Sequence, residues 1–194
     1  MIQTAHEHTS HIIKDLKEVQ EVALPTETVY GLAIALNSAT ALEKLIFLKR
    51  RDLQSGKIFT LVPESRADIS KYATLNKLSR EYIGKYIPGE ITLILHKNPD
   101  FSHPYFNHFT TVGIRIPASP LFEKILPETG PLLLTSANPR GDTPAISSDE
   151  VAKTMPKVDL IVEGRTVEGK KPSTIVDLTN KTPKILRQGD LKVL

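Results

Sequence analysis

A turn at residues 25–31 (Pro-Thr-Glu-Thr-Val-Tyr-Gly) gathers two hydroxyls, a carboxylate and a phenol directly after a short apolar run. Hydroxyls and exposed backbone amides bind a small zwitterion or a phosphate well. The threonine hydroxyls can also do no more than satisfy the backbone of the turn. Taken alone, the segment is consistent with a ligand site and with a purely structural turn.

A cluster of cations, Lys49, Arg50 and Arg51, ends a predicted helix. Cations at this position complement the helix dipole, so a solvated helix end would explain them. They could instead form a clamp, because lysine supplies a point charge and arginine a planar fork that fits carboxylate or phosphate. The cluster alone does not decide between the two readings.

Two further polar segments follow predicted strands. Residues 135–141 (Thr-Ser-Ala-Asn-Pro-Arg-Gly) form a hydroxyl- and amide-rich turn that could cradle a phosphate or a nucleotide. The turn lacks the glycine spacing and the lysine of a P-loop, and no dinucleotide-binding fingerprint occurs in the chain. Residues 171–174 add a second hydroxyl pair, and residues 186–189 add another arginine.

Several common chemistries are excluded. The chain has no cysteine, so it can form neither a disulfide nor a thiolate site. It has no Gly-x-Ser-x-Gly elbow and no His-Glu-x-x-His motif. His6, His8 and His11 cluster near the start of the chain, where such side chains are usually solvated, so we expect no functional metal site in the protein.

Bulk composition fits a globular protein of 194 residues, with 40% hydrophobic and 24% charged residues. The formal charge of +3 is compatible with an anionic partner such as a nucleotide or RNA. The first residues contain no apolar run, so we expect no secretory signal there. The longest apolar stretch, residues 91–95, is far too short to span a bilayer, and we expect no membrane segment.

Helical and strand-like segments alternate along the chain. The predicted helices span residues 10–20, 38–49, 65–72, 76–86 and 120–125, with a short one after Ser147. The predicted strands span residues 22–24, 58–62, 91–96, 111–116, 131–135, 160–162, 174–178 and 184–186. Thr40 and Glu43 have the spacing of a capping box, as do Ser147 and Glu150. The alternation predicts one α/β domain over residues 1–194, built on a large twisted, mixed sheet with flanking helices.

Taken in order, these segments resemble the YrdC-like family of threonylcarbamoyl-AMP synthases, of the single-domain TsaC type, over about residues 24–189. The motifs are Pro-Thr-Glu-Thr-Val-Tyr-Gly-Leu at 25–32, Lys-x-Arg at 49–51, Pro-Gly-x-x-Thr at 88–92, Val-Gly-Ile-Arg-Ile-Pro at 112–117, Thr-Ser-Ala-Asn at 135–138, Pro-Ser-Thr-Ile-Val-Asp at 172–177 and Leu-Arg-x-Gly at 186–189. Any one of them could be a coincidence, whereas all of them in order are specific.

The resemblance implies a cytoplasmic nucleotidyltransferase with a YrdC-like fold and a concave, positively charged cavity. Its substrates would be ATP with Mg²⁺, L-threonine and bicarbonate, and its products threonylcarbamoyl-AMP and pyrophosphate. A tRNA-modifying transferase complex would then use the product to form N6-threonylcarbamoyladenosine in tRNA.

The family's motifs also imply roles for particular residues. The implied catalytic set is Lys49, Arg51, Ser136 and Asn138. The residues implied to hold threonine or bicarbonate are Thr26, Tyr30 and Ser173. Nucleotide binding would use the catalytic set together with Arg115, Thr135 and Arg187. We also hypothesise that Lys49 and Arg51 hold the carbamate and the α-phosphate together.

The main alternative is a non-catalytic module that binds double-stranded RNA or tRNA in the same basic cavity. Ser136 and Asn138 argue against it, because an RNA binder needs charge but not that pair. Another alternative is a carbamoyl-adenylate enzyme of the hydrogenase-maturation type. Those enzymes carry zinc-finger modules, which a chain without cysteine cannot hold.

Overall fold

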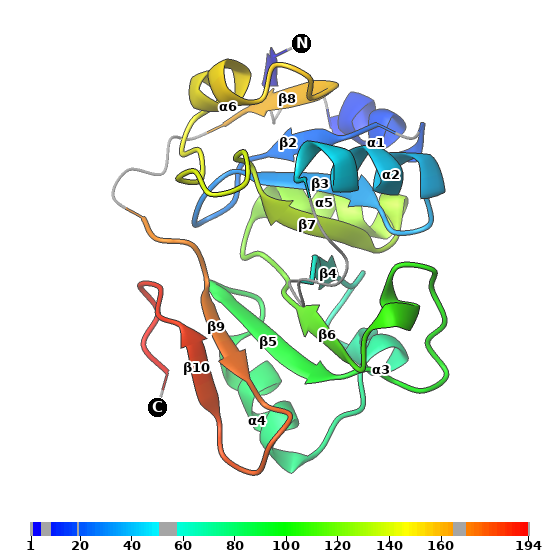
Figure 1. Cartoon of the computed structure of the whole chain (residues 1–194), viewed down its shortest axis with the longest axis vertical. Helices are drawn as coiled ribbons and strands as arrows, with labels where there is room; N and C mark the ends of the chain where they lie inside the picture. Colours follow the sequence, from blue (N-terminus) through cyan, green and yellow to red (C-terminus); the bar gives the residue numbers. More distant parts are fainter. Residues whose placement is uncertain (1, 5–8, 19, 51–57, 165–169, 194) are drawn as a thin grey trace.

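Ten strands form one mixed sheet in the computed structural model of the chain, in the order β1-β8-β2-β3-β7-β4-β6-β5-β9-β10 (Figure 1). The structure describes residues 2–4, 9–18, 20–50, 58–164 and 170–193. The strands are β1 Ile2–Thr4, β2 Val22–Leu24, β3 Gly31–Ala35, β4 Thr60–Val62, β5 Ile91–His96, β6 Thr111–Ile114, β7 Leu132–Ser136, β8 Leu160–Glu163, β9 Thr174–Asp177 and β10 Lys184–Arg187.

The strand directions are mixed throughout. The pairs β1–β8, β2–β8, β4–β6 and β5–β9 are parallel, and the other neighbours are antiparallel. Figure 1 shows that the strand direction turns from one end of the sheet to the other, as the right-handed twist of strands requires. The predicted α/β class and the large twisted, mixed sheet are thus confirmed.

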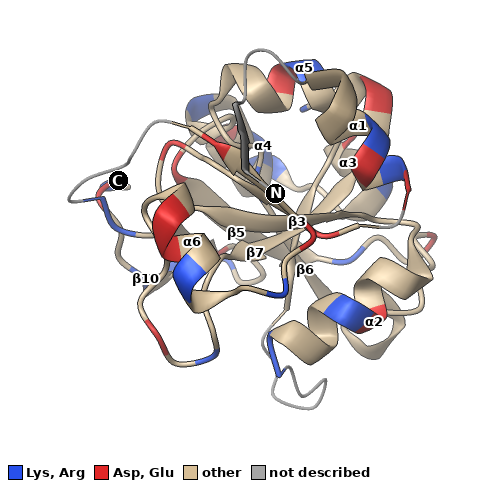
Figure 2. Ribbon diagram, turned by 90° about the horizontal axis from the view of Figure 1, so that it is seen from above, with Lys and Arg blue, Asp and Glu red and all other residues tan. Residues whose placement is uncertain are grey.

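Helices cover both faces of the sheet (Figure 2). The helices are α1 Thr9–Lys17, α2 Ala39–Leu48, α3 Ile69–Tyr72, α4 Lys77–Tyr86, α5 Pro120–Thr129 and α6 Ser148–Thr154, with a short 3-10 turn at Phe106–His108. Helices α1 and α5 pack together on one face, while α2 and α6 lie on the other. No helix in the described part of the chain is long and apolar enough to cross a membrane.

The helix starts follow local hydrogen bonding, and one predicted cap is wrong. Helix α2 is capped by Ser38, whose side chain accepts a hydrogen bond from the backbone N–H of Ala41, and not by Thr40 with Glu43. Helix α6 begins after Ser147 as predicted, because the Ser147 hydroxyl accepts from the Glu150 N–H. A side-chain acceptor at this position satisfies one of the free amides of the first turn.

Two elements differ from the sequence predictions because their residues are buried. The sequence prediction missed β3, which lies between β2 and β7 and has four consecutive buried residues from Gly31 to Ile34. Buried on both faces, the strand shows no polar alternation. Helix α5 continues through Pro127 to Thr129, because Ile125 and Leu126 remain in the core, and it ends at Gly130 with a φ of 72°.

Most of the remaining strand boundaries are close to the predictions. Strands β2 and β5 have the predicted bounds, and most other strands begin or end within two residues of them. The predicted helix over residues 65–72 is reduced to the single turn α3, and β1 was not predicted. The core is one hydrophobic cluster, in which Tyr30, Phe59, Phe106 and Phe122 are the largest fully buried side chains.

Candidate functional site

A cavity of about 530 Å³ lies on one face of the neighbouring strands from β3 to β10. Its lining comprises Thr26, Val29, Tyr30, Gly31, Ile58, Thr60, Thr92, Ile94, Thr111, Arg115, Leu134, Thr135, Ser136, Pro172, Ser173, Ile175, Leu186 and Arg187. Lining residues recur two apart, as in Thr92 and Ile94 or Ser173 and Ile175, because alternate side chains of a strand share a face. Polar groups thus meet an apolar wall in a volume suited to a small-molecule ligand.

The turn before β3 is held by a directed chain of hydrogen bonds. The Thr26 hydroxyl donates to the Val29 carbonyl over 2.7 Å and accepts from the Thr28 backbone N–H over 3.1 Å. Thr26 has given its one hydroxyl hydrogen to Val29, so in the 3.0 Å contact between the two hydroxyls Thr28 is the donor. Thr28 Oγ1 in turn accepts from Arg115 Nη2 over 2.9 Å.

This chain of hydrogen bonds bears on the role expected for Thr26. Thr26 lines the cavity, but its hydroxyl hydrogen is already used within the turn. Its contact with a ligand would therefore be made by its methyl group, by its backbone, or after the hydroxyl has rotated. The turn also aims Arg115 across the cavity, because Arg115 follows the end of β6 and reaches back to Thr28.

A buried ion pair joins the turn to β6. Glu27 Oε1 lies 3.1 Å from Arg115 Nη2, and the side chains of Arg115 and Glu27 are 8% and 17% exposed. Neither carboxylate oxygen of Glu27 is within hydrogen-bonding geometry of any described residue, and the same holds for Arg115 Nε. Glu27 was not assigned a role from the sequence. A single carboxylate between two threonines gives no signal of its own, since its partner is 88 positions further along the chain.

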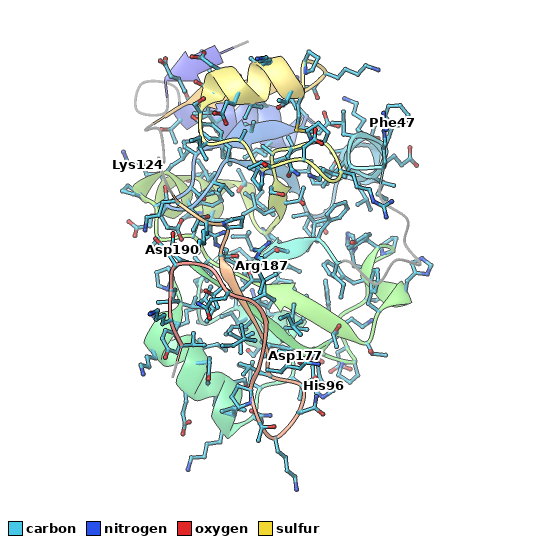
Figure 3. The ribbon with its side chains drawn as sticks, turned by 60° about the vertical axis from the view of Figure 1, so that its left-hand side comes forward. Phe47, His96, Lys124, Asp177, Arg187 and Asp190 are labelled. Carbon is cyan, nitrogen blue, oxygen red and sulfur yellow. The ribbon has the colours of Figure 1, made fainter. Side chains whose placement is uncertain are left out.

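A second arginine reaches the cavity from the last strand. Arg187 Nε donates to the Ser173 carbonyl over 2.9 Å, and Arg187 Nη2 donates to the Ser173 hydroxyl over 3.1 Å. That hydroxyl also meets Thr92 Oγ1 at 2.9 Å, so β5, β9 and β10 are linked at this point. Figure 3 shows Arg187 near the middle of the molecule. Arg187 as a whole residue is exposed, but its guanidinium lies against Ser173. Partial desolvation there, and then the charge of Arg115, lower the pKa of Arg187.

Lys49 lies behind the turn that follows β7, and it does not line the cavity. Its ammonium is only slightly exposed, at 6% for the residue, and donates to the carbonyls of Ser136 and Asn138 and to Asn138 Oδ1. These acceptors hold the ammonium against the turn that follows β7. The Ser136 hydroxyl also donates to Asn138 Oδ1, so the three residues form one bonded unit.

The remaining predicted residues take different positions. Tyr30 is among the lining residues, but it is fully buried and its hydroxyl donates to the Val162 carbonyl over 3.2 Å. Thr135 lies in the lining next to Ser136. Asn138 is buried, and its amide nitrogen donates to the carbonyls of Pro139 and Asp142. Arg51 lies outside the described residues, so its predicted role stays a prediction.

The cavity offers little to a metal ion. No group of three or more histidine, cysteine, aspartate or glutamate side chains comes together within the described ranges. The residues of the lining supply hydroxyls and guanidinium groups but no carboxylate. Mg²⁺ prefers carboxylates, phosphates and water, so in this cavity phosphate oxygens and water would have to provide its ligands.

Comparison with known proteins assigns the chain to a family. Residues 14–189 match the family model of the Sua5, YciO and YrdC proteins, which bears the description "Telomere recombination". The chain belongs to this family. A Vibrio campbellii protein named threonylcarbamoyl-AMP synthase is 32% identical over 92% of this chain and 97% of its own length.

Solved structures of the Sua5/YciO/YrdC family share the fold. Escherichia coli YciO superimposes with a TM-score of 0.84 and 25% identity, over 94% of this chain and 89% of its own. Sua5 of P. abyssi, solved in complex with L-threonine, gives a TM-score of 0.87 and 26% identity over 98% of this chain. This chain spans 58% of the length of that Sua5 chain. The family resemblance inferred from the sequence motifs is thus confirmed.

Proposed function

We propose that this chain is an L-threonylcarbamoyladenylate synthase. The observation that carries the proposal is a cavity with two arginines and a row of hydroxyls, in a member of a family whose relatives bear that name. The solved P. abyssi relative binds L-threonine, which supports threonine as the amino-acid substrate. The chain would then be an enzyme of the nucleotidyltransferase type.

The reaction joins three substrates in two bond-forming steps. The amine nitrogen of threonine bonds to the carbon derived from bicarbonate, which gives a carbamate and releases water. A carbamate oxygen then bonds to the α-phosphorus of ATP, and the bond from that phosphorus to the bridging oxygen breaks, so that pyrophosphate leaves. Such transfer depends on positioning and on stabilising negative charge more than on a protein nucleophile.

The residues that face the cavity can supply both needs. Arg115 and Arg187 would hold the phosphates or the carboxylate of threonine, since guanidinium groups bind both anions through paired hydrogen bonds. Ser173, Thr135 and Ser136 add hydroxyls around them. Mg²⁺ would enter with ATP, bound to its phosphates, and neutralise part of their charge.

Lys49 holds the turn that carries Ser136 and Asn138 through its hydrogen bonds to that turn. Its contact with the carbamate and the α-phosphate stays a proposal that the Lys-x-Arg motif implies. Arg51 is proposed to make the contact with the reacting groups, as the Lys-x-Arg motif implies. Thr26 and Tyr30 would shape the threonine site from the turn before β3.

We further propose that the product goes to a tRNA-modifying transferase complex in the cytoplasm. Threonylcarbamoyl-AMP is a mixed anhydride and needs an acceptor nearby before water attacks it. Contact with tRNA or double-stranded RNA is a separate expectation that follows from the basic charge of the chain. A module that only binds RNA is not favoured, since the curated relatives are named as synthases.

Carbon-13 bicarbonate tests the proposed chemistry directly. The protein is incubated with ATP, Mg²⁺, L-threonine and the labelled bicarbonate, and the adenylate product is examined by mass spectrometry. The proposal predicts threonylcarbamoyl-AMP that carries one labelled carbon. An unlabelled threonyl-adenylate, or no adenylate at all, would sink the proposal.

A further inference from the structure

The ion pair between Glu27 and Arg115 is unusual for its lack of supporting hydrogen bonds. The carboxylate lies 3.1 Å from Arg115 Nη2, yet both of its oxygens are buried without a hydrogen-bond partner among the described residues. Burying charges is costly unless the remaining oxygens are also satisfied, so such a pair is weak evidence for stability. The carboxylate of Glu27 also offsets the positive charge that Arg115 brings to the cavity.

Glu27 does not belong to the cavity lining, although its neighbour Thr26 and its partner Arg115 do. Its Oε1 lies 3.1 Å from Arg115 Nη2, and both of its oxygens are closed to solvent. The carboxylate therefore acts on a bound ligand through Arg115, and not by touching it.

Two like charges share the cavity. Arg115 and Arg187 both line it, and the charge of Arg115 contributes to the lowered pKa of Arg187. Glu27 is ion-paired with Arg115, whereas the Ser173 carbonyl and hydroxyl that hold Arg187 carry no charge. Among the described residues, these three charged groups contribute one net positive charge at the cavity in place of two.

We propose that Glu27 is a positioning residue that acts as the built-in counter-ion of Arg115 and limits how tightly the cavity binds a phosphate anion. The inference rests on the proposed function, in which pyrophosphate is the leaving product. The carboxylate holds Arg115 toward the Thr28 hydroxyl and opposes any anion that approaches the same guanidinium. Its effect is largest on pyrophosphate, which is the small product with the greatest charge density, and so it favours product release.

The test is the affinity for inorganic pyrophosphate, measured by titration calorimetry without added Mg²⁺. Glu27→Gln keeps the shape of the side chain and an oxygen that can accept from Arg115, but it removes the charge. We expect it to bind pyrophosphate about tenfold more tightly than the unchanged chain, because one repulsive unit charge in a poorly solvated site has been lost. Glu128→Gln makes the same change in net charge at an exposed position on α5 and is the matched control. Its affinity for pyrophosphate should stay within about twofold of that of the unchanged chain.

A gain in affinity separates this role from a structural one, since damage to the fold would weaken binding. Equal or weaker binding by Glu27→Gln would overturn the inference. If neither the unchanged chain nor Glu27→Gln binds pyrophosphate, the proposed function itself is contradicted, so the two failures are distinct.

A second comparison covers the case in which the single variant does not fold. The double variant Glu27→Gln/Arg115→Gln replaces the buried pair as a unit, which proteins tolerate better than losing one partner. It should bind pyrophosphate about tenfold more tightly than Arg115→Gln alone, where the carboxylate is left uncompensated beside the cavity. Equal affinities of these two variants would also overturn the inference.

Discussion

At the scale of single residues, the site depends on which polar atoms remain available to a ligand. Arg187 uses Nε and one hydrogen of Nη2 on Ser173, which fixes the plane of the guanidinium in the cavity. We expect Arg187→Ala to lower kcat/KM by about 10²–10³-fold, as for other charged contacts to a transition state. Lys184→Ala removes an exposed cation from the same strand and should change the rate less than about twofold. Initial rates of pyrophosphate release measure both, and equal effects of the two variants would contradict the assignment.

Residue types were easier to predict than their hydrogen bonds. The sequence motifs pointed to Thr26, Arg115, Ser173 and Arg187, and the structure brings all of them around one cavity. The sequence could not indicate that the ammonium of Lys49 donates to the 136–138 turn, because those acceptors lie 87 and 89 positions away in the chain. Hydrogen-bond partners of this kind are set by tertiary packing.

At the scale of elements, the junction of β9 and β10 determines where Ser173 and Arg187 meet. A Cβ on Gly189 would lie 2.4 Å from the Pro172 carbonyl oxygen and 2.8 Å from the Thr174 backbone nitrogen. We expect Gly189→Ala to destabilise the fold by about 1–3 kcal/mol, as overpacking does, and to lower activity as the junction opens. Gly84→Ala lies within α4 with no atom within 4 Å of the new carbon, and it should stabilise the helix by about 0.5–1 kcal/mol.

Urea unfolding of these two variants checks both signs. A Gly189→Ala variant as stable as the unchanged chain would contradict this close contact.

Two of the elements that the sequence prediction missed share one cause. Strand β3 lacks the expected polar spacing, and the end of α5 contains a proline. In both elements, burial in the core outweighs the local preference of the sequence.

At the scale of the whole molecule, one buried carboxyl links stability to pH. Glu21 is 1% exposed, and burial, together with the nearby carboxylate of Asp159, raises its pKa to about 8, partly offset by Lys44. The folded chain then holds a proton that the unfolded chain, with a Glu21 pKa of 4.5, has already lost. Stability should therefore fall as pH rises from about 4.5 to 8, by at most about 1.4 kcal/mol per pH unit, and level off above that range.

Glu21→Gln removes this link. Melting temperatures of the variant and the unchanged chain should agree near pH 5 and separate toward pH 8, with the variant the more stable. A constant difference across that range would show that Glu21 titrates as an ordinary carboxyl. Asp159 and Lys44, the charged groups that contact Glu21, are retained in the variant.

The order of the strands is the part of the fold that the sequence could least predict. Strand β8 lies between β1 and β2, and β7 lies between β3 and β4, although each of these strands is far from its neighbours in the chain. Such pairings depend on long-range packing, whereas the alternation of helices and strands is local and was predicted. The cavity spans the pairings of β7 with β3 and β4, which is why its shape came only with the structure.

The most direct test of the central claim is pyrophosphate release from ATP with each of the twenty amino acids, with and without bicarbonate. The proposed function predicts release that requires Mg²⁺, L-threonine and bicarbonate together. Release that is independent of bicarbonate, or that is supported equally by other amino acids, would contradict the claim. No release under any condition, with salt-sensitive tRNA binding, would instead indicate a module that binds RNA without catalysis.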